Sequence, residues 1–239
     1  YDGTKYHQIP LEDINPVDKL YVRVKYPSDS GYAFQCHGCD EDSVEVSEEK
    51  GGSTVLTIEK NNLEAVQLEN TIPSWIIPYK YLEVSSTNSW KDVNDWALDI
   101  FAQDDDDKVD NTLSEICYED FSQDDKINAI IDFVQDEIRY MGIESGMGSI
   151  KPFTPNQTLA QRFGDCKDKA LLLTTMLERI GIEKSYPALV NSSTQHNIEQ
   201  FLPSGHIFDH VIVCFELNGK QYWLDPSNPF QGGTYKDID

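Results

Sequence analysis

Apolar and polar residues alternate along the first third of the chain. Between residues 20 and 27 every second side chain is apolar, and Arg23 and Lys25 occupy two of the positions between them. A period of two is typical of a half-buried β-strand. Similar patterns after a Gly-Gly turn predict strands over residues 53–62 and 63–70.

The hydrophobic period changes near Thr87. From there on, apolar residues recur every three or four positions in several segments, which predicts amphipathic helices. Helices are predicted over residues 89–102, 124–142, 156–163 and 164–181, and strands over residues 183–190, 208–217 and 220–227. This order predicts a β-rich N-terminal domain over residues 1–86 and an α+β domain over residues 87–239.

The charge balance is strongly acidic, with 42 Asp and Glu against 19 Lys and Arg and a formal net charge of -23. Such a field repels phosphate backbones and anionic lipid, so we expect neither nucleic acid nor a membrane surface as a partner. No segment approaches the ~20 apolar residues that span a bilayer. The chain begins at Tyr1 rather than at a methionine, which indicates processing or excision. The compartment therefore stays open, with the periplasm or the extracellular space favoured.

Two segments suggest metal sites and are explained more simply. Residues 103–111 contain four adjacent aspartates but lack the ligand spacing and the glycine of an EF-hand, so we expect a solvated linker. Cys36 and Cys39 have CxxC spacing, but the second pair of a zinc site is missing. We expect a loop or a local disulfide there rather than a functional CxxC site. No metal or organic cofactor is predicted.

Cys166 is the first candidate for chemistry, because it lies at the start of a largely apolar helix. Asp165 is a good N-cap, and Asp168 completes the pattern of a capping box. In the first turn, free N–H groups and the helix dipole favour a thiolate. A small buried residue at a crowded helix start is the competing interpretation, and these residues alone do not decide between the two. We expect the flanking Lys167 and Lys169 to be solvated.

A downstream hairpin supplies a base and an orienting carboxylate. Asn218-Gly219 is the preferred type I′ turn between two apolar strands, and its two residues set the pairing register. In that register His210 and Asp225 are diagonal neighbours on the same face, within hydrogen-bonding reach. Cys166, His210 and Asp225 therefore have the chemistry of a nucleophile, a general base and an orienting group.

At these residues the chain resembles the transglutaminase-like superfamily. The resemblance is carried by "RFGDCKDKALLLTTMLERIGI", "FDHVIV" and "YWLDPS", and it extends over about residues 70–239. It implies a papain-like core of helices packed on an antiparallel sheet, in the bacterial branch in which this core follows a β-rich domain. It also implies the catalytic roles of Cys166, His210 and Asp225.

The expected function is thiol-dependent acyl transfer on peptide or side-chain amides, with hydrolysis favoured, as in a cysteine protease or amidase. A cross-linking transglutaminase would use a lysine amine as acceptor instead of water. A protein- or peptide-binding module could retain the same three residues without turnover. An acetyltransferase acting on a thioester carrier ranks lower, because no basic pocket for a coenzyme's phosphates is visible. In each of the first three cases the partner is a peptide or protein, and the oligomeric state is undetermined.

Overall fold

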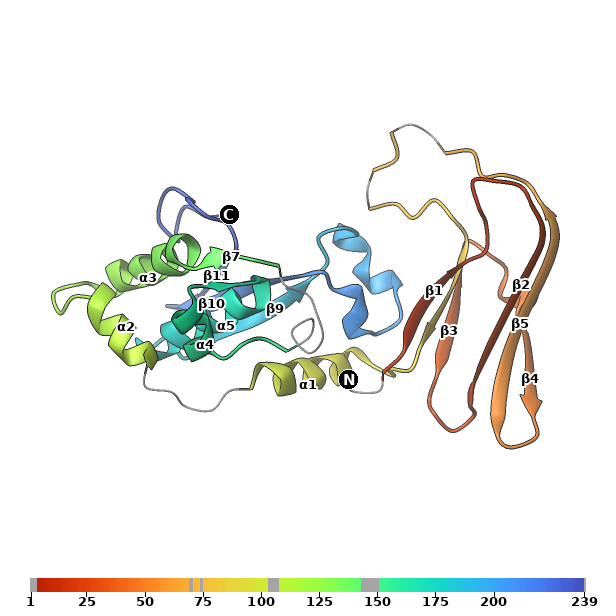
Figure 1. Ribbon diagram of the computed structural model, residues 1–239, viewed down its shortest axis with the longest axis horizontal. Coiled ribbons are helices and arrows are strands. Elements are labelled where there is room, and N and C mark those ends of the chain that lie inside the picture. The colour runs from red at the N-terminus through yellow and green to blue at the C-terminus, as the bar shows by residue number, and fades with distance from the viewer. Residues whose placement is uncertain (1–3, 69–70, 74, 103–107, 143–150, 239) are drawn as a thin grey trace. The chain divides into compact units, whose positions relative to one another are not determined.

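The computed structural model describes residues 4–68, 71–73, 75–102, 108–142 and 151–238, and its chain forms two compact units (Figure 1). Unit 1 comprises Tyr1–Trp96 and Asn191–Ile207, and unit 2 comprises Ala97–Val190 and Phe208–Asp239. The division falls inside helix α1 (Trp90–Phe101). The domain boundary between residues 86 and 87 stays a prediction.

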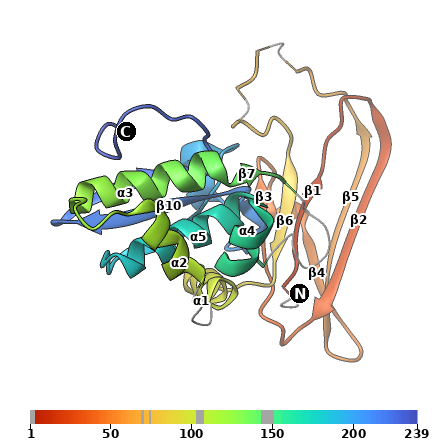
Figure 2. The ribbon, with the colours of Figure 1, turned by 60° about the vertical axis from the view of Figure 1, so that its left-hand side comes forward.

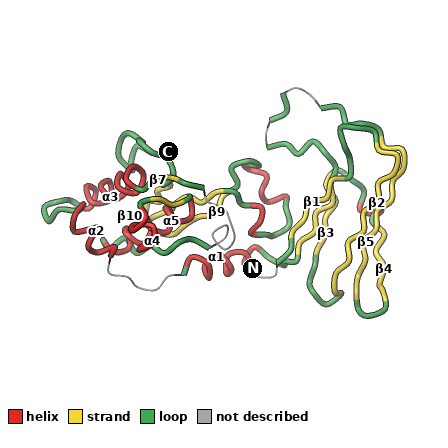
Figure 3. Tube along the Cα trace, viewed as in Figure 1, coloured by secondary structure: helices red, strands yellow, loops and turns green. Residues whose placement is uncertain are grey.

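Unit 1 is built from two antiparallel three-stranded sheets, seen as strands in Figure 3. Their strands are β1 (Tyr6–Pro10), β2 (Val17–Pro27), β3 (Ala33–His37), β4 (Glu45–Glu49), β5 (Ser53–Leu63) and β6 (Tyr81–Ser85). The strand orders are β1-β6-β3 and β2-β5-β4. Alternate apolar side chains from both sheets, including Val22, Ile58 and Leu82, form one buried cluster. The cluster is what the period of two predicts.

The strand predicted over residues 63–70 is wrong over residues 64–68, and residues 69–70 lie outside the described residues. The reason lies in the register, because Leu63 pairs with Val17, the first residue of β2. No residue of β2 is left to pair with the chain that follows, so residues 64–68 are irregular. The CxxC segment begins in β3, and its Cys36 and Cys39 form a disulfide.

Both faces of β6 are buried. Leu82 and Val84 point into the cluster between the sheets, whereas Glu83 and Ser85 face the other side. The segment Asn191–Ile207 covers that other side, where the amide of Leu202 donates to Glu83 at 3.0 Å. Unit 1 therefore includes a piece of chain that leaves and re-enters the sheet of unit 2.

The sheet of unit 2 contains the predicted hairpin. Its strands are β9 (Ser185–Val190), β10 (His210–Leu217) and β11 (Lys220–Leu224), in the antiparallel order β11-β10-β9. Leu217 pairs with Lys220 and Val213 with Leu224, which confirms the predicted register. Asn218 and Gly219 both have positive φ, at 53° and 77°, as a type I′ turn requires.

Helices cover one face of this sheet, and α5 packs on β9 and β10 (Figure 2). They are α2 (Lys108–Ile116), α3 (Gln123–Asp132), α4 (Pro155–Gln161) and α5 (Cys166–Arg179). Helix α2 starts inside the segment predicted as a linker, whereas residues 104–107 with the four aspartates lie outside the described residues. Within the described part of the chain, no helix is both long and apolar enough to cross a membrane.

The helix predicted over residues 124–142 is shorter than expected. Helix α3 ends at Asp132. A π-helical turn, Phe133–Glu137, follows it directly, and we call this segment the π-turn. Ile138 then adopts an extended conformation and leads into β7 (Arg139–Tyr140), which pairs in parallel with β8 (Phe163–Gly164). The inward positions of the predicted helix are nevertheless buried, because the apolar stripe continues through the π-turn.

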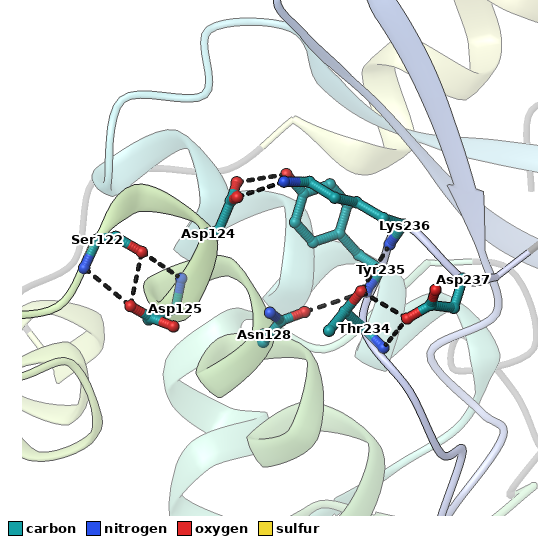
Figure 4. Close-up of polar contacts among 8 residues, drawn as sticks. All are labelled: Ser122, Asp124, Asp125, Asn128, Thr234, Tyr235, Lys236 and Asp237. Atoms are coloured by element: carbon teal, nitrogen blue, oxygen red, sulfur yellow. Dashed lines mark hydrogen bonds and ion pairs between the residues drawn. The ribbon is translucent and has the colours of Figure 1, made fainter.

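The C-terminal segment is anchored on α3 (Figure 4). The hydroxyl of Tyr235 donates to Asp124 at 2.6 Å, and the amide of Tyr235 donates to the side chain of Asn128 at 3.0 Å. Lys236 adds an ion pair with Asp124. These contacts hold the end of the chain against the helix that leads into the π-turn.

Candidate active site

Cys166 occupies the first turn of α5 and is partly exposed. The predicted capping box is present: the carboxylate of Asp165 accepts from the amides of Lys167 and Asp168, and Asp168 accepts from the amide of Asp165 at 2.9 Å. A Cβ at Gly164 would lie 2.7 Å from the Cβ of Asp168, so this approach to the helix needs glycine. Local sequence thus places the sulfur at a rigid helix start.

The two lysines beside Cys166 are buried, so the prediction that they are solvated is wrong. The ammonium of Lys167 pairs with the Asp165 carboxylate, and the residue is 7% exposed. Lys169 is 0% exposed, and its Nζ donates to the carbonyl oxygens of Ile138 at 2.7 Å and of Gln135 at 3.1 Å. Both ammonium groups are compensated by polar partners in the folded chain. Helix periodicity in the sequence does not predict such partners.

His210 and Asp225 form the hydrogen-bonded pair that the hairpin register predicts. The distance from His210 Nε2 to Asp225 Oδ2 is 2.7 Å. Asp225 lies one residue beyond β11, and its other oxygen accepts from the amide of Ser227 at 2.8 Å and from its hydroxyl at 2.6 Å. Burial tends to raise the pKa of Asp225, but the hydrogen bonds from His210 and Ser227 outweigh it and lower that pKa.

The structure brings Cys166 to the same imidazole. The hydrogen bond to Asp225, followed by one with Cys166, raises the pKa of His210 from 6.5 to about 10. Since Nε2 is engaged by Asp225, Nδ1 is the ring nitrogen open to the sulfur. The three residues singled out from the sequence therefore lie together, although they come from α5, β10 and the end of β11.

Two further residues next to this trio were missed by reasoning from the sequence. Gln135, which is 3% exposed, donates from Nε2 to the backbone carbonyl of Asp225 at 2.9 Å. Lys169 holds the backbone of Gln135 from the other side. A signal was available for Lys169, because α5 is apolar around most of its circumference and a lysine within it must be buried. For Gln135 the sequence offers no comparable signal.

Across the residues that the structure places, no group of three or more His, Cys, Asp or Glu side chains is arranged to hold a metal ion. The charged and polar groups around Cys166 are instead engaged with one another, as the capping box and the His210–Asp225 pair show. What the arrangement offers chemically is a sulfur, an imidazole and a carboxylate in series.

Comparison with known proteins shows which family part of this chain resembles. Residues 111–222 match the core of the Transglutaminase-like superfamily. No curated protein matches the chain. A candidate protease from Parabacteroides distasonis ATCC 8503 has the same fold, with a TM-score of 0.74 and 18% identity over 94% of this chain and 43% of that one. This chain thus spans less than half the length of that structure.

A candidate cysteine protease from Cytophaga hutchinsonii aligns with a TM-score of 0.38 and 12% identity, over 94% of this chain and 75% of that one. The family match includes Cys166 and His210, and Asp225 follows its end by three residues. Residues 111–222 therefore carry the core of the transglutaminase-like superfamily.

Proposed function

We propose that this protein is a thiol-dependent acyl-transfer enzyme that hydrolyses peptide or side-chain amides, with Cys166, His210 and Asp225 as its catalytic triad. The observation that carries the proposal is the position of His210, which bonds to Asp225 at 2.7 Å and whose pKa is raised by Asp225 and then by Cys166. A base held by a carboxylate and facing a nucleophile is the arrangement that covalent catalysis needs.

The imidazole is in its proton-donating form at neutral pH. The raised pKa of His210, about 10, leaves the ring as imidazolium, and Asp225 stays ionised beside it. An imidazolium next to a sulfur stabilises the thiolate, and the N-terminus of α5 adds to that effect. The proposed reaction therefore starts from the thiolate of Cys166 next to the imidazolium of His210, which Asp225 orients.

The reaction follows from this starting state. The thiolate of Cys166 attacks the amide carbonyl, forming the C–S bond and a tetrahedral oxyanion. The C–N bond then breaks as His210 gives its proton to the leaving amine, and a thioester remains on Cys166. Water attacks the thioester while His210 takes its proton, and the acid is released with the thiolate regenerated. The pair loses one proton to the amine and regains one from water, so it returns to its starting state after each turnover.

The oxyanion needs a donor at the helix start. The amides of Lys167 and Asp168 are engaged by Asp165, so we assign the amide of Cys166 to this role. A lysine amine in place of water would convert the same thioester into a cross-link. The hydrolytic assignment is therefore tested by the acceptor, separately from the triad.

The triad is tested by alkylation of the native protein with iodoacetamide at about pH 6, followed by peptide mapping. Cys117 is an internal control, since it is partly buried and burial raises the pKa of its thiol. We expect Cys166 to react at least tenfold faster than Cys117, and His210→Gln to remove this advantage. Equal rates at the two thiols would contradict the proposal and favour a binding module.

The reaction is tested with a library of peptides and amides, both alone and with an added primary amine. Free acid as the product in both cases supports hydrolysis, whereas incorporation of the amine identifies a cross-linking enzyme. Loss of all turnover in Cys166→Ala is expected. Turnover at the wild-type rate in that variant would eliminate the mechanism.

A further inference from the structure

Lys169 is a fully buried cation for which the proposed reaction has no direct use. It follows Cys166 by three residues on α5, and its ammonium reaches only interior groups. Burying an unpaired ammonium is costly, so a lysine in this position must be compensated by specific contacts. Those contacts, to the carbonyl groups of Gln135 and Ile138, show what it does.

The two carbonyl groups belong to the π-turn and to the residue that follows it. A π-turn breaks the regular i→i−4 ladder, and such turns occur often at functional sites. Here the ammonium on α5 bonds to two carbonyls that lie three residues apart, at 3.1 Å and 2.7 Å. Lys169 thereby fixes the π-turn relative to the helix that carries the nucleophile.

Side chains of the π-turn in turn hold the segment that follows β11. Gln135 Nε2 donates to the carbonyl of Asp225 at 2.9 Å and to the side chain of Gln231 at 2.8 Å. Asp136 accepts from the amide of Phe230 at 2.7 Å. The farther end of the same segment is anchored to α3 at Tyr235 (Figure 4).

The sheet does not fix Asp225 by itself. The β10–β11 ladder ends at the pair Val213–Leu224, one residue before Asp225. The backbone of Asp225 is instead held by Gln135, and its carboxylate by Ser227 and His210. A closed ring of contacts results, from the nucleophile's helix through the π-turn to Asp225, and from there through His210 back to the sulfur.

We propose that Lys169 is a positioning residue, which acts through the π-turn and Gln135 to hold Asp225 against His210. Its consequence for catalysis rests on the function proposed above, whereas its consequence for the His210–Asp225 pair does not. Asp136 and Asp225 are the charged groups that Lys169 faces from the π-turn and from the end of β11. Removal of its charge alone would strengthen proton binding at His210, because one nearby cation is lost.

Loss of the Lys169 charge alone raises the pKa of His210, whereas loss of the position of Asp225 lowers it. The direction of the change therefore shows which effect dominates. We would measure the titration of His210 by NMR in wild type, Lys169→Met and Gln135→Met, with the resonance assigned by its loss in His210→Gln. If Lys169 positions Asp225, both variants weaken the His210–Asp225 bond, and the pKa of His210 falls by at least about one unit. An unchanged pKa in both folded variants, or a rise in Lys169→Met with none in Gln135→Met, would overturn the proposal.

Gln123→Met is the matched control. Gln123 also donates from Nε2 to a backbone carbonyl, that of Ile180, but it lies at the far end of α3. The titration of His210 should stay as in wild type in this variant. Gln135→Met changes no charge and keeps the side-chain shape, so it preserves the test if Lys169→Met fails to fold. In the double variant Lys169→Met/Gln135→Met, the pKa of His210 should fall by less than the sum of the two single shifts. The reason is that both residues act along one chain of contacts.

Turnover gives a second readout. With an amide substrate found by screening, Lys169→Met should lower kcat at least tenfold with KM little changed, since Lys169 touches no substrate. A rise in KM at constant kcat would contradict a positioning role. If Cys166→Ala retained full turnover, the proposed function would fail, and the titration would still decide the role of Lys169.

Discussion

Replacing Asp225 by Asn tests how strongly the carboxylate holds the imidazolium of His210. The substitution removes the negative charge but keeps the size of the side chain and an oxygen that can accept from Ser227. We expect the pKa of His210 to fall from about 10 toward its ordinary value of 6.5, because the hydrogen bond to Asp225 is the main cause of its elevation. Loss of the interaction between His210 and Asp225 should make the difference in the free energy of unfolding between wild type and Asp225→Asn depend on pH.

The magnitude follows from the two pKa values. The difference of about 3.5 between 6.5 and about 10 corresponds to at most about 4.8 kcal/mol, at about 1.36 kcal/mol per unit. The side chain of His210 is 21% exposed. Solvent screening reduces the interaction, so we expect about 2–3 kcal/mol of stabilisation. Because the folded-state pKa is raised, this stabilisation is complete below 6.5 and is lost as the pH rises through about 10.

The assay is urea unfolding of wild type and Asp225→Asn at several values between about pH 6 and pH 10. The variant should be less stable at the acidic end, and the difference should shrink toward the alkaline end. Comparing the two proteins at each pH cancels the titrations of groups that do not interact with Asp225. Lys169, whose pKa burial lowers to about 8, does interact with Asp225, so its own titration is measured in both proteins. Asp237→Asn is a matched control, since Asp237 accepts from Thr234 and has no histidine partner in the contacts described. A pH-independent difference for Asp225→Asn would refute the reasoning.

Three substitutions test the packing described above by urea or thermal unfolding. Gly164→Ala should cost about 1–3 kcal/mol by overpacking, since its Cβ would lie 2.7 Å from that of Asp168, and wild-type stability would contradict this. Cys36→Ser should lower the free energy of unfolding by about 2 kcal/mol, because the disulfide with Cys39 is lost. An unchanged melting temperature would show that this disulfide does not stabilise the fold. Glu83→Leu should lower the free energy of unfolding by about 3 kcal/mol or more. This wholly buried carboxylate accepts three hydrogen bonds, and their donors would be left unpaired. Wild-type stability in this variant would contradict that explanation.

The sequence predicts those parts of the site whose structure is set by residues close together along the chain. A two-residue Asn-Gly turn has a definite register, and that register puts His210 and Asp225 on one face with no knowledge of the rest of the fold. The start of α5 is equally local, because Asp165 and Asp168 cap the helix within a few residues of Cys166. The grouping of Cys166 with His210 and Asp225 rests on their complementary chemistry and on the family resemblance, because no short-range rule connects the helix to the hairpin.

The parts that the sequence did not predict depend on groups distant along the chain. Hydrophobic periodicity is the same for an α-helix that continues past Asp132 and for one that passes into a π-turn, since Val134 and Ile138 are buried in either case. The carbonyl groups that Lys169 bonds to are more than 30 residues away from it. Sequence therefore reports that a lysine lies in an apolar helix, but not that its partners are backbone carbonyls.

The burial of Lys169 also bears on why the site is polar inside. Cys166, His210 and Asp225 come from three segments, namely α5, β10 and the end of β11, whose relative positions must be fixed. An apolar residue at position 169 would fill the space but leave the carbonyls of Gln135 and Ile138 without their donor. The ammonium satisfies both and joins the nucleophile's helix to the segment that carries Asp225. Under the positioning role proposed above, its burial serves the geometry of the His210–Asp225 pair as well as the stability of the fold.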